Sequence, residues 1–181
     1  MSMRSLVAIT LAILAFGGLA MAAGGTRVAH PALGRTATTE DVAAWDVSIG
    51  PDGKGLPPGR GTAETGEAVY LAKCVGCHGE KGAGKPNDRL AGGRETLASD
   101  QPAVKTVGSY WPYATTIFDY VRRAMPINEP KSLTHDEVYA VVAYLLKING
   151  IISDGEIIDA QSLPRIKMPN REGFVPFARG Q

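Results

Sequence analysis

The chain has 181 residues, 44% of them hydrophobic, and carries 19 Lys and Arg against 18 Asp and Glu, for a formal net charge of +1. This length suffices for one domain with a core of its own. The near-neutral balance, without a basic stripe interleaved with aromatics, argues against nucleic acid as a partner.

Residues 1–22 carry the pattern of a secretory signal peptide. Arg4 supplies a short basic start, an apolar run follows from Leu6 to Phe16, and Ala20-Met21-Ala22 forms an A-x-A cleavage site. A membrane anchor is the alternative, because the apolar stretch approaches the roughly 18 residues that a span requires. Gly17 and the small-residue cleavage site favour removal. We therefore expect a periplasmic protein with no stable membrane insertion after signal cleavage.

Residues 23–61 are predicted to form an extended arm. The run Gly50–Gly59 reads GPDGKGLPPG, a composition that interrupts helices and strands and favours turns. Trp45, Val47 and Ile49 alternate with polar neighbours. We expect these three side chains to dock the arm onto the domain.

Residues 62–150 are expected to form the domain, with three helices. The first is predicted from Thr65 to Cys74, and the second from Thr116 to Ala124, where apolar residues recur at helical spacing. The third follows the capping box Thr134–Glu137 and carries one apolar stripe. No run alternates well enough to indicate a sheet, so the predicted fold class is all-α.

Residues 151–181 are predicted to be an irregular tail. They show little periodicity and contain three prolines. Their apolar residues argue for a segment that wraps over the domain, because a freely disordered tail would be more polar. Those residues are Ile157, Ile158, Leu163, Ile166 and Phe174.

Cys74-Val75-Gly76-Cys77-His78 is a C-x-x-C-H run, the attachment motif of a c-type haem. Two thiols at this spacing can reach the two vinyl groups of one porphyrin, and the adjacent histidine then becomes an axial ligand of the iron. Because Cys74 and Cys77 are the only cysteines, we expect one covalently attached haem c.

Three other chemistries use paired cysteines. A thioredoxin-type redox pair requires a βαβ setting, and a zinc site requires four protein ligands, with only His30, His78 and His135 available to complete it. A structural disulfide gives no reason for a histidine directly after the second cysteine. In an exported protein a cysteine pair closes a disulfide or binds a cofactor, and His78 favours the cofactor.

Met125 is the predicted second axial ligand. A low-spin electron-transfer haem needs a ligand opposite the histidine, and a thioether raises the reduction potential. Met125 directly follows the second helix, and Pro126, with its fixed φ, stiffens the backbone that presents the sulfur. Met168 has a similar Met-Pro setting in the tail and stays an alternative, as do the nitrogens of His30 and His135. A methionine can also simply fill a core.

The chain resembles the class I cytochromes c at three places. These are the run C-x-x-C-H-G-E-K-G-A-G at Cys74–Gly84, the Met-Pro pair 47 residues past His78, and the closing helix at Glu137–Leu146. The resemblance implies a helical fold around one haem whose edge is exposed, with the first and last helices crossing.

The same resemblance implies several contacts. Gly66 and Tyr70 are expected to meet Tyr144 and Leu145 at the helix crossing. The carbonyl of Pro86 is expected to accept a hydrogen bond from His78 Nδ1. A separate expectation follows from side-chain chemistry: two buried haem propionates need hydrogen-bond donors, and the candidates are Arg94, Tyr110 and Trp111. The alternative is that Trp111 and Tyr113 are ordinary core aromatics and Arg94 is solvated.

Three further blocks resemble SoxD, the cytochrome subunit of sulfur-oxidising Sox systems, and related sulfite dehydrogenase cytochromes. They are Ser48–Gly59, Thr106–Thr115 and Lys167–Arg171. Some members of that family carry a second haem module, which this chain lacks. The resemblance implies a partner, a molybdenum-cofactor dehydrogenase that oxidises sulfite or protein-bound sulfane sulfur and passes single electrons to the haem.

The predicted function is electron transport by a periplasmic monohaem cytochrome in sulfur oxidation, with no catalytic residues of its own. It accepts electrons from the sulfite or sulfane-sulfur dehydrogenase subunit and passes them to a downstream cytochrome or oxidase of the respiratory chain. The alternative is a haem enzyme of peroxidase type, or a gas sensor, with an open sixth coordination position. A thioether at Met125 argues against that alternative, because it blocks the position.

Overall fold

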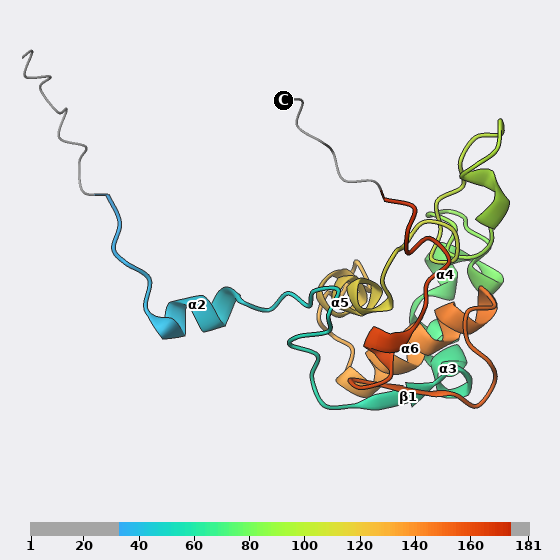
Figure 1. Cartoon of the computed structure of the whole chain (residues 1–181). Coiled ribbons are helices and arrows are strands. Elements are labelled where there is room, and N and C mark those ends of the chain that lie inside the picture. The colour runs from blue at the N-terminus through green and yellow to red at the C-terminus, as the bar shows by residue number, and fades with distance from the viewer. Residues whose placement is uncertain (1–32, 175–181) are drawn as a thin grey trace, which may run out of the picture. The chain divides into compact units, whose positions relative to one another are not determined.

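The computed structural model describes residues 33–174 (Figure 1). The chain divides into two compact units, Met1–Thr38 and Thr39–Gln181. Every helix and strand described lies in the second unit. Within residues 33–174, no helix is long and apolar enough to cross a membrane. The predicted signal peptide, residues 1–22, lies outside the described residues.

Helix α3 (Ala63–Lys73) begins two residues before the predicted start. Thr62 caps it: the Thr62 hydroxyl accepts from the backbone N–H of Thr65 at 3.3 Å, and the Thr65 hydroxyl accepts from the N–H of Thr62 at 3.1 Å. This reciprocal arrangement satisfies two N–H groups that the first turn leaves without helical partners. The helix delivers the chain directly to Cys74.

Helix α6 (His135–Ile148) is the centre of the fold. The predicted capping box is confirmed, with the N–H of Thr134 donating to Glu137 Oε2 at 2.7 Å. The helix is more deeply buried than the single apolar stripe predicts, because every residue from Val138 to Leu146 is buried. A helix buried on all sides must be covered by several other elements.

Helices α3 and α6 cross in contact at a glycine. A Cβ added at Gly66 would overlap the backbone carbonyl of Ala140, so the two backbones meet without an intervening side chain. The rings of Tyr70 and Tyr144 lie 5.0 Å apart at the same crossing. The expected contact of Gly66 and Tyr70 with Tyr144 is therefore confirmed, and Ala140 is the residue nearest the glycine.

Helix α5 (Ala114–Ala124) packs its apolar face against α6, and the rings of Phe118 and Tyr139 lie 4.4 Å apart. It starts two residues before the predicted position and ends at Met125, whose backbone is extended. The residue before a proline is disfavoured in helical conformation, which explains the stop ahead of Pro126.

The predicted helical class is confirmed, with one short sheet in addition. Strands β1 (Arg60–Thr62) and β2 (Ile157–Asp159) pair antiparallel, with Gly61 opposite Ile158. Three residues are too few to show a period-2 pattern, which is why the sequence did not reveal them. The short helices described, besides α2 (Thr39–Trp45), are α4 (Val75–His78), η1 (Glu80–Gly82), η2 (Arg94–Thr96) and η3 (Leu163–Arg165).

The tail packs onto the domain. Ile158, Leu163 and Met168 are all buried, each at most 2% exposed. Pairing of β2 with β1 ties the tail to the start of the domain. Through these contacts the chain beyond α6 becomes part of the core.

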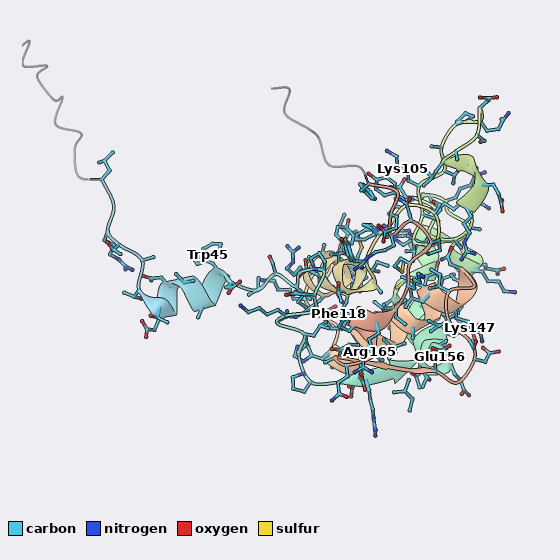
Figure 2. All side chains as sticks on the ribbon, in the orientation of Figure 1. Trp45, Lys105, Phe118, Lys147, Glu156 and Arg165 are labelled. Carbon is cyan, nitrogen blue, oxygen red and sulfur yellow. The ribbon has the colours of Figure 1, made fainter. Side chains whose placement is uncertain are left out.

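The arm differs from its prediction. Residues Thr39–Trp45 form a short helix, α2, that buries none of its side chains. Ile49 is buried at 3% exposure, as expected, whereas Trp45 is 86% exposed and does not dock (Figure 2). Alternate residues share one face only where the backbone is extended. Trp45 still belongs to helix α2, so its side chain does not lie on the same face as Ile49.

Candidate functional site

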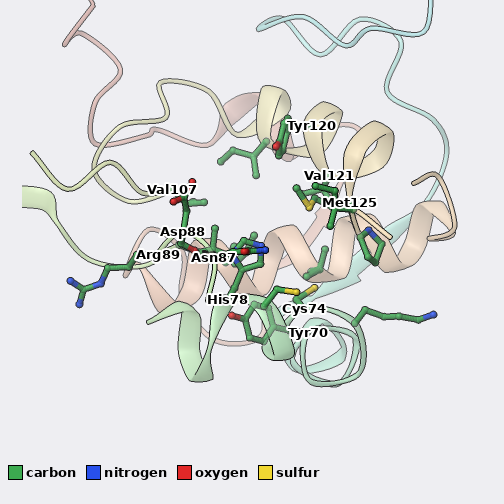
Figure 3. A pocket seen from close by; sticks show the side chains of 18 of the residues that line it. Tyr70, Cys74, His78, Asn87, Asp88, Arg89, Val107, Tyr120, Val121 and Met125 are labelled. Atoms are coloured by element: carbon green, nitrogen blue, oxygen red, sulfur yellow. Dashed lines mark hydrogen bonds between the residues drawn. The ribbon is translucent and has the colours of Figure 1, made fainter. Parts of the chain in front are cut away.

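A cavity of about 560 Å³ lies between helices α3, α4, α5 and α6 (Figure 3). Its apolar wall comes mainly from α5 and α6, and its polar groups come from α4 and the loops that follow. The apolar wall consists of Ile117, Val121, Leu133, Val141 and Leu145. A cavity of this size falls within the range of cofactor sites.

Cys74, Cys77 and His78 line the same side of this cavity. Cys74 ends α3 and begins α4, and its carbonyl accepts from the N–H of His78 at 3.0 Å. One helical turn thus places two thiols and one imidazole together. Both cysteines are free. The pKa of the Cys74 thiol is raised to about 11, mainly because the thiol is buried and to a lesser extent because Cys77 is close by.

The ring of His78 is oriented by the backbone. Its Nδ1 lies 2.8 Å from the carbonyl oxygen of Asp88. A carbonyl only accepts, so Nδ1 carries the proton and donates. In the neutral imidazole this makes Nε2 the nitrogen with a free lone pair for a metal. The hydrogen bond fixes both the tautomer and the direction of the ring.

The expectation that Pro86 supplies this carbonyl is wrong. The N–H of Asn87 donates to the Cys77 carbonyl at 2.9 Å, and the N–H of Lys85 donates to the Asn87 carbonyl at 2.8 Å. These two bonds fold residues 85–88 into a turn against α4. The turn brings the carbonyl of Asp88, two residues further on, beside the histidine ring.

Met125 lines the cavity from the wall opposite His78 (Figure 3). Its backbone N–H still donates to Val121 at 3.0 Å, so the end of α5 fixes where the side chain starts. Met168 is 2% exposed, lies in the core and does not line the cavity. His135 is exposed at the start of α6, also away from the cavity, and His30 lies outside the described residues.

Of the predicted propionate partners, only Trp111 lines the cavity, where its ring lies 5.8 Å from that of Tyr120. Arg94 is directed elsewhere, since its Nη2 donates to the Asn149 carbonyl at the end of α6 at 2.8 Å. Tyr110 stands outside the cavity, with Phe174 against its ring at 5.2 Å.

Three cationic residues in the cavity wall were not predicted from the sequence. Lys73 ends α3, and its Nζ lies 3.7 Å from Glu129 Oε2. The other two are Arg89 and Lys105. Both lie in loops without periodicity, so no sequence pattern distinguished them from ordinary surface charges. Lys105 Nζ also lies 5.0 Å from the centre of the Tyr110 ring. Their positive charge suits carboxylate groups at the mouth of the cavity.

The alternatives for the cysteine pair find no support in the described part of the chain. Residues 33–174 contain no group of three or more His, Cys, Asp and Glu side chains that could hold a metal ion. The pair lies between two helices, and the one sheet described is a two-stranded antiparallel ribbon. Neither a zinc site nor a thioredoxin-type site matches this arrangement.

The side chains around the cavity fit a covalently bound haem. Two free thiols and the imidazole of His78 face a thioether across an apolar space. Cationic groups stand in the loops at its edge. Thiols, imidazole and thioether together form the donor set of a c-type haem with histidine and methionine ligands.

Comparisons with known proteins agree with this chemistry. Residues 61–145 match the family model described as cytochrome c oxidase, cbb3-type, subunit III. The crystal structure of the sulfane dehydrogenase SoxCD from Paracoccus pantotrophus is similar, with 42% sequence identity and a TM-score of 0.74. That alignment covers 83% of this chain and 74% of the other. A search of the curated proteins gave no match.

Proposed function

Since the chain belongs to the class I c-type cytochromes, in the family of the SoxD cytochrome subunit, we propose that it is a periplasmic monohaem electron-transfer protein. The observation that carries this proposal is the meeting of Cys74, Cys77, His78 and Met125 around one apolar cavity. Within residues 33–174, this cavity brings the C-x-x-C-H motif and the methionine predicted as a ligand to one site.

Cys74 and Cys77 would hold the haem through thioether bonds, and His78 Nε2 and Met125 Sδ would bind its iron. When bound, the haem supplies an iron that alternates between two oxidation states and so carries one electron. Asp88 holds the imidazole in the ligating tautomer through its carbonyl. The residues of the apolar wall exclude water, which favours a high reduction potential.

Arg89, Lys105 and Trp111 are the residues in the cavity wall suited to bind the propionates. An indole N–H and two cationic groups supply the donors that buried carboxylates need. This assignment replaces Arg94 and Tyr110, whose side chains are engaged outside the cavity.

The proposed electron donor is a molybdenum-cofactor dehydrogenase that oxidises sulfane sulfur or sulfite, and the acceptor is a downstream cytochrome or oxidase of the respiratory chain. The 42% identity to the sulfane dehydrogenase structure supports this pairing. As a ligand of the iron, Met125 would occupy the position where a substrate could bind, so the chain itself would be no enzyme.

The test mixes the purified, oxidised holoprotein with the dehydrogenase subunit and either sulfite or a sulfane-sulfur donor. Reduction of the haem, followed by absorbance, is expected to be much faster than that of an unrelated cytochrome c in the same mixture. Equal rates would overturn the pairing. A high-spin ferric spectrum at neutral pH would instead support a haem enzyme or sensor with an open sixth position.

A further inference from the structure

The helix α2 exposes large apolar side chains that nothing in the described chain covers. Trp45 is 86% exposed and Val42 is 54% exposed, and no residue of α2 is buried. Figure 2 shows the Trp45 side chain standing out from the helix. Tryptophan is usually well buried in folded proteins and is enriched among the residues that dominate binding energy at interfaces.

The two side chains share one face of the helix. Val42 and Trp45 are three residues apart, which places them side by side on a helical surface. Glu40 and Asp41 lie in the first turn and Asp46 follows the helix, whereas residues 39–53 contain no Lys or Arg. The helix therefore presents an apolar centre with an acidic surround.

A firm anchor follows directly after this helix. Ile49 is buried, and its N–H donates to Asp119 Oδ1 at 2.9 Å. Arg122 Nη1 donates to the Val47 carbonyl at 3.3 Å, and Thr115 Oγ1 donates to the Pro51 carbonyl at 3.2 Å. The chain is thus fixed on α5, the helix that ends at Met125, and α2 precedes the anchor.

From these observations we infer that residues 39–46 are a second docking surface, separate from the haem cavity, for the dehydrogenase subunit that donates electrons. This inference rests on the proposed function. The surface on the dehydrogenase would be an apolar pocket for Trp45 and Val42 with basic residues at its rim, complementary to the acidic surround.

Two findings favour this occupant. The alignment with the sulfane dehydrogenase structure covers 83% of the chain. Residues 49–174, which include the domain that holds the cavity, make up a smaller share of the chain than that. The similarity therefore extends beyond this domain. In addition, an isolated helix of seven residues is marginal in water and is stabilised mainly by packing. A second contact on the same chain would hold the two proteins together by raising the effective concentration of the haem edge.

The experiment measures binding of the full-length holoprotein to the purified dehydrogenase subunit by calorimetry. The variant Val42→Ala/Trp45→Ala is expected to raise Kd by about tenfold or more, as for a truncated interface anchor. The control Leu71→Ala/Ile157→Ala removes two side chains that are 56% and 53% exposed on α3 and β2. It is expected to leave Kd unchanged. The optical spectrum and the rate of reduction by dithionite are expected to match wild type in both variants.

The outcomes separate this inference from the proposed function. If the wild type binds and is reduced by the dehydrogenase, and the α2 variant does so equally well, the docking surface is wrong and the function stands. If the wild type neither binds nor is reduced, both are wrong. If the wild type self-associates through α2, so that only the variant is monomeric in sedimentation, the occupant is a second copy and the inference is overturned.

Discussion

Gly66 of α3 lies directly against the backbone carbonyl of Ala140 in α6, so that the two helices cross with no side chain between them. An added methyl group would overlap this carbonyl and also approach Tyr144 Cβ to 3.0 Å. We expect Gly66→Ala to lower the free energy of unfolding by roughly 1–3 kcal/mol or more, the usual cost of overpacking.

Denaturant unfolding of the holoprotein measures that loss. Glu67→Ala, at the next and exposed position of the same helix, is the matched control and should change stability little. If Gly66→Ala is as stable as this control, the close crossing is not as described.

The crossing also shows which parts of the fold a sequence can reveal. The contact between Gly66 and Tyr144 was predicted from the resemblance to a known family. Helix α6 was predicted from the sequence alone, because its capping box and apolar spacing identify it. The strand β1 and its partner β2 gave no signal, because three-residue strands are fixed by their pairing across the fold.

Met125 and Met168 have the same local sequence setting but opposite structural roles. Met125 lines the cavity, while Met168 is buried in the core at 2% exposure. We expect Met125→Ala to abolish the sulfur-to-iron charge-transfer band in the near-infrared. Met168→Ala should keep the band and lower the free energy of unfolding by about 2–5 kcal/mol, because it leaves a cavity in the core.

Near-infrared absorbance of the ferric holoproteins distinguishes the two. Loss of the band in the Met168 variant alone would reverse the ligand assignment. Sequence reasoning favoured Met125 as the ligand because it directly follows a helix, and the structure places Met125 in the cavity wall. The position of Met168 could not be predicted in the same way, because the course of the tail depends on how it packs against the rest of the domain.

Asp119 joins the arm to α5. Its Oδ1 accepts from the N–H of Ile49 at 2.9 Å and from Arg123 Nε at 3.0 Å, and the residue is 7% exposed. Replacing Asp119 by Ala leaves a buried backbone N–H and a guanidinium without acceptors, so we expect a loss of about 1–3 kcal/mol in unfolding free energy.

Arg123→Ala provides the comparison for Asp119→Ala. Its side chain is 41% exposed, and its removal leaves the bond between Asp119 and Ile49 in place. It should therefore cost less than Asp119→Ala in urea unfolding. An equal or larger loss in the Arg123 variant would show that the ion pair, and not the bond to the arm, accounts for the effect.

Lys105 adds positive charge to the wall of the cavity. A nearby cation disfavours the more positive, oxidised state of the iron, so we expect Lys105→Gln to lower the reduction potential. Lys147→Gln, which removes a lysine that pairs with Asp154 away from the cavity, is the control. Redox titration measures both, and an unchanged potential in Lys105→Gln would place this charge too far from the haem to matter.

Tyr139 links α6 to the arm and should make stability depend on pH in the alkaline range. Its hydroxyl donates to the Pro57 carbonyl at 2.8 Å, and burial is the main reason that its pKa is raised to about 12. An unfolded tyrosine ionises near pH 10. The folded state therefore holds this proton more tightly, and the stability linked to it is complete below about pH 10 and is lost as the pH rises from about 10 to 12.

Tyr139→Phe removes both the hydrogen bond and the titration. We expect the variant to be about 1 kcal/mol less stable than wild type at pH 7, because the Pro57 carbonyl loses its donor. Between pH 10 and 12 its stability should fall less steeply than that of wild type. Tyr70, with its pKa also raised to about 12, still titrates in both proteins, so some slope remains. Urea unfolding across this range measures the difference, and identical slopes would mean that Tyr139 ionises alike in the folded and unfolded chain.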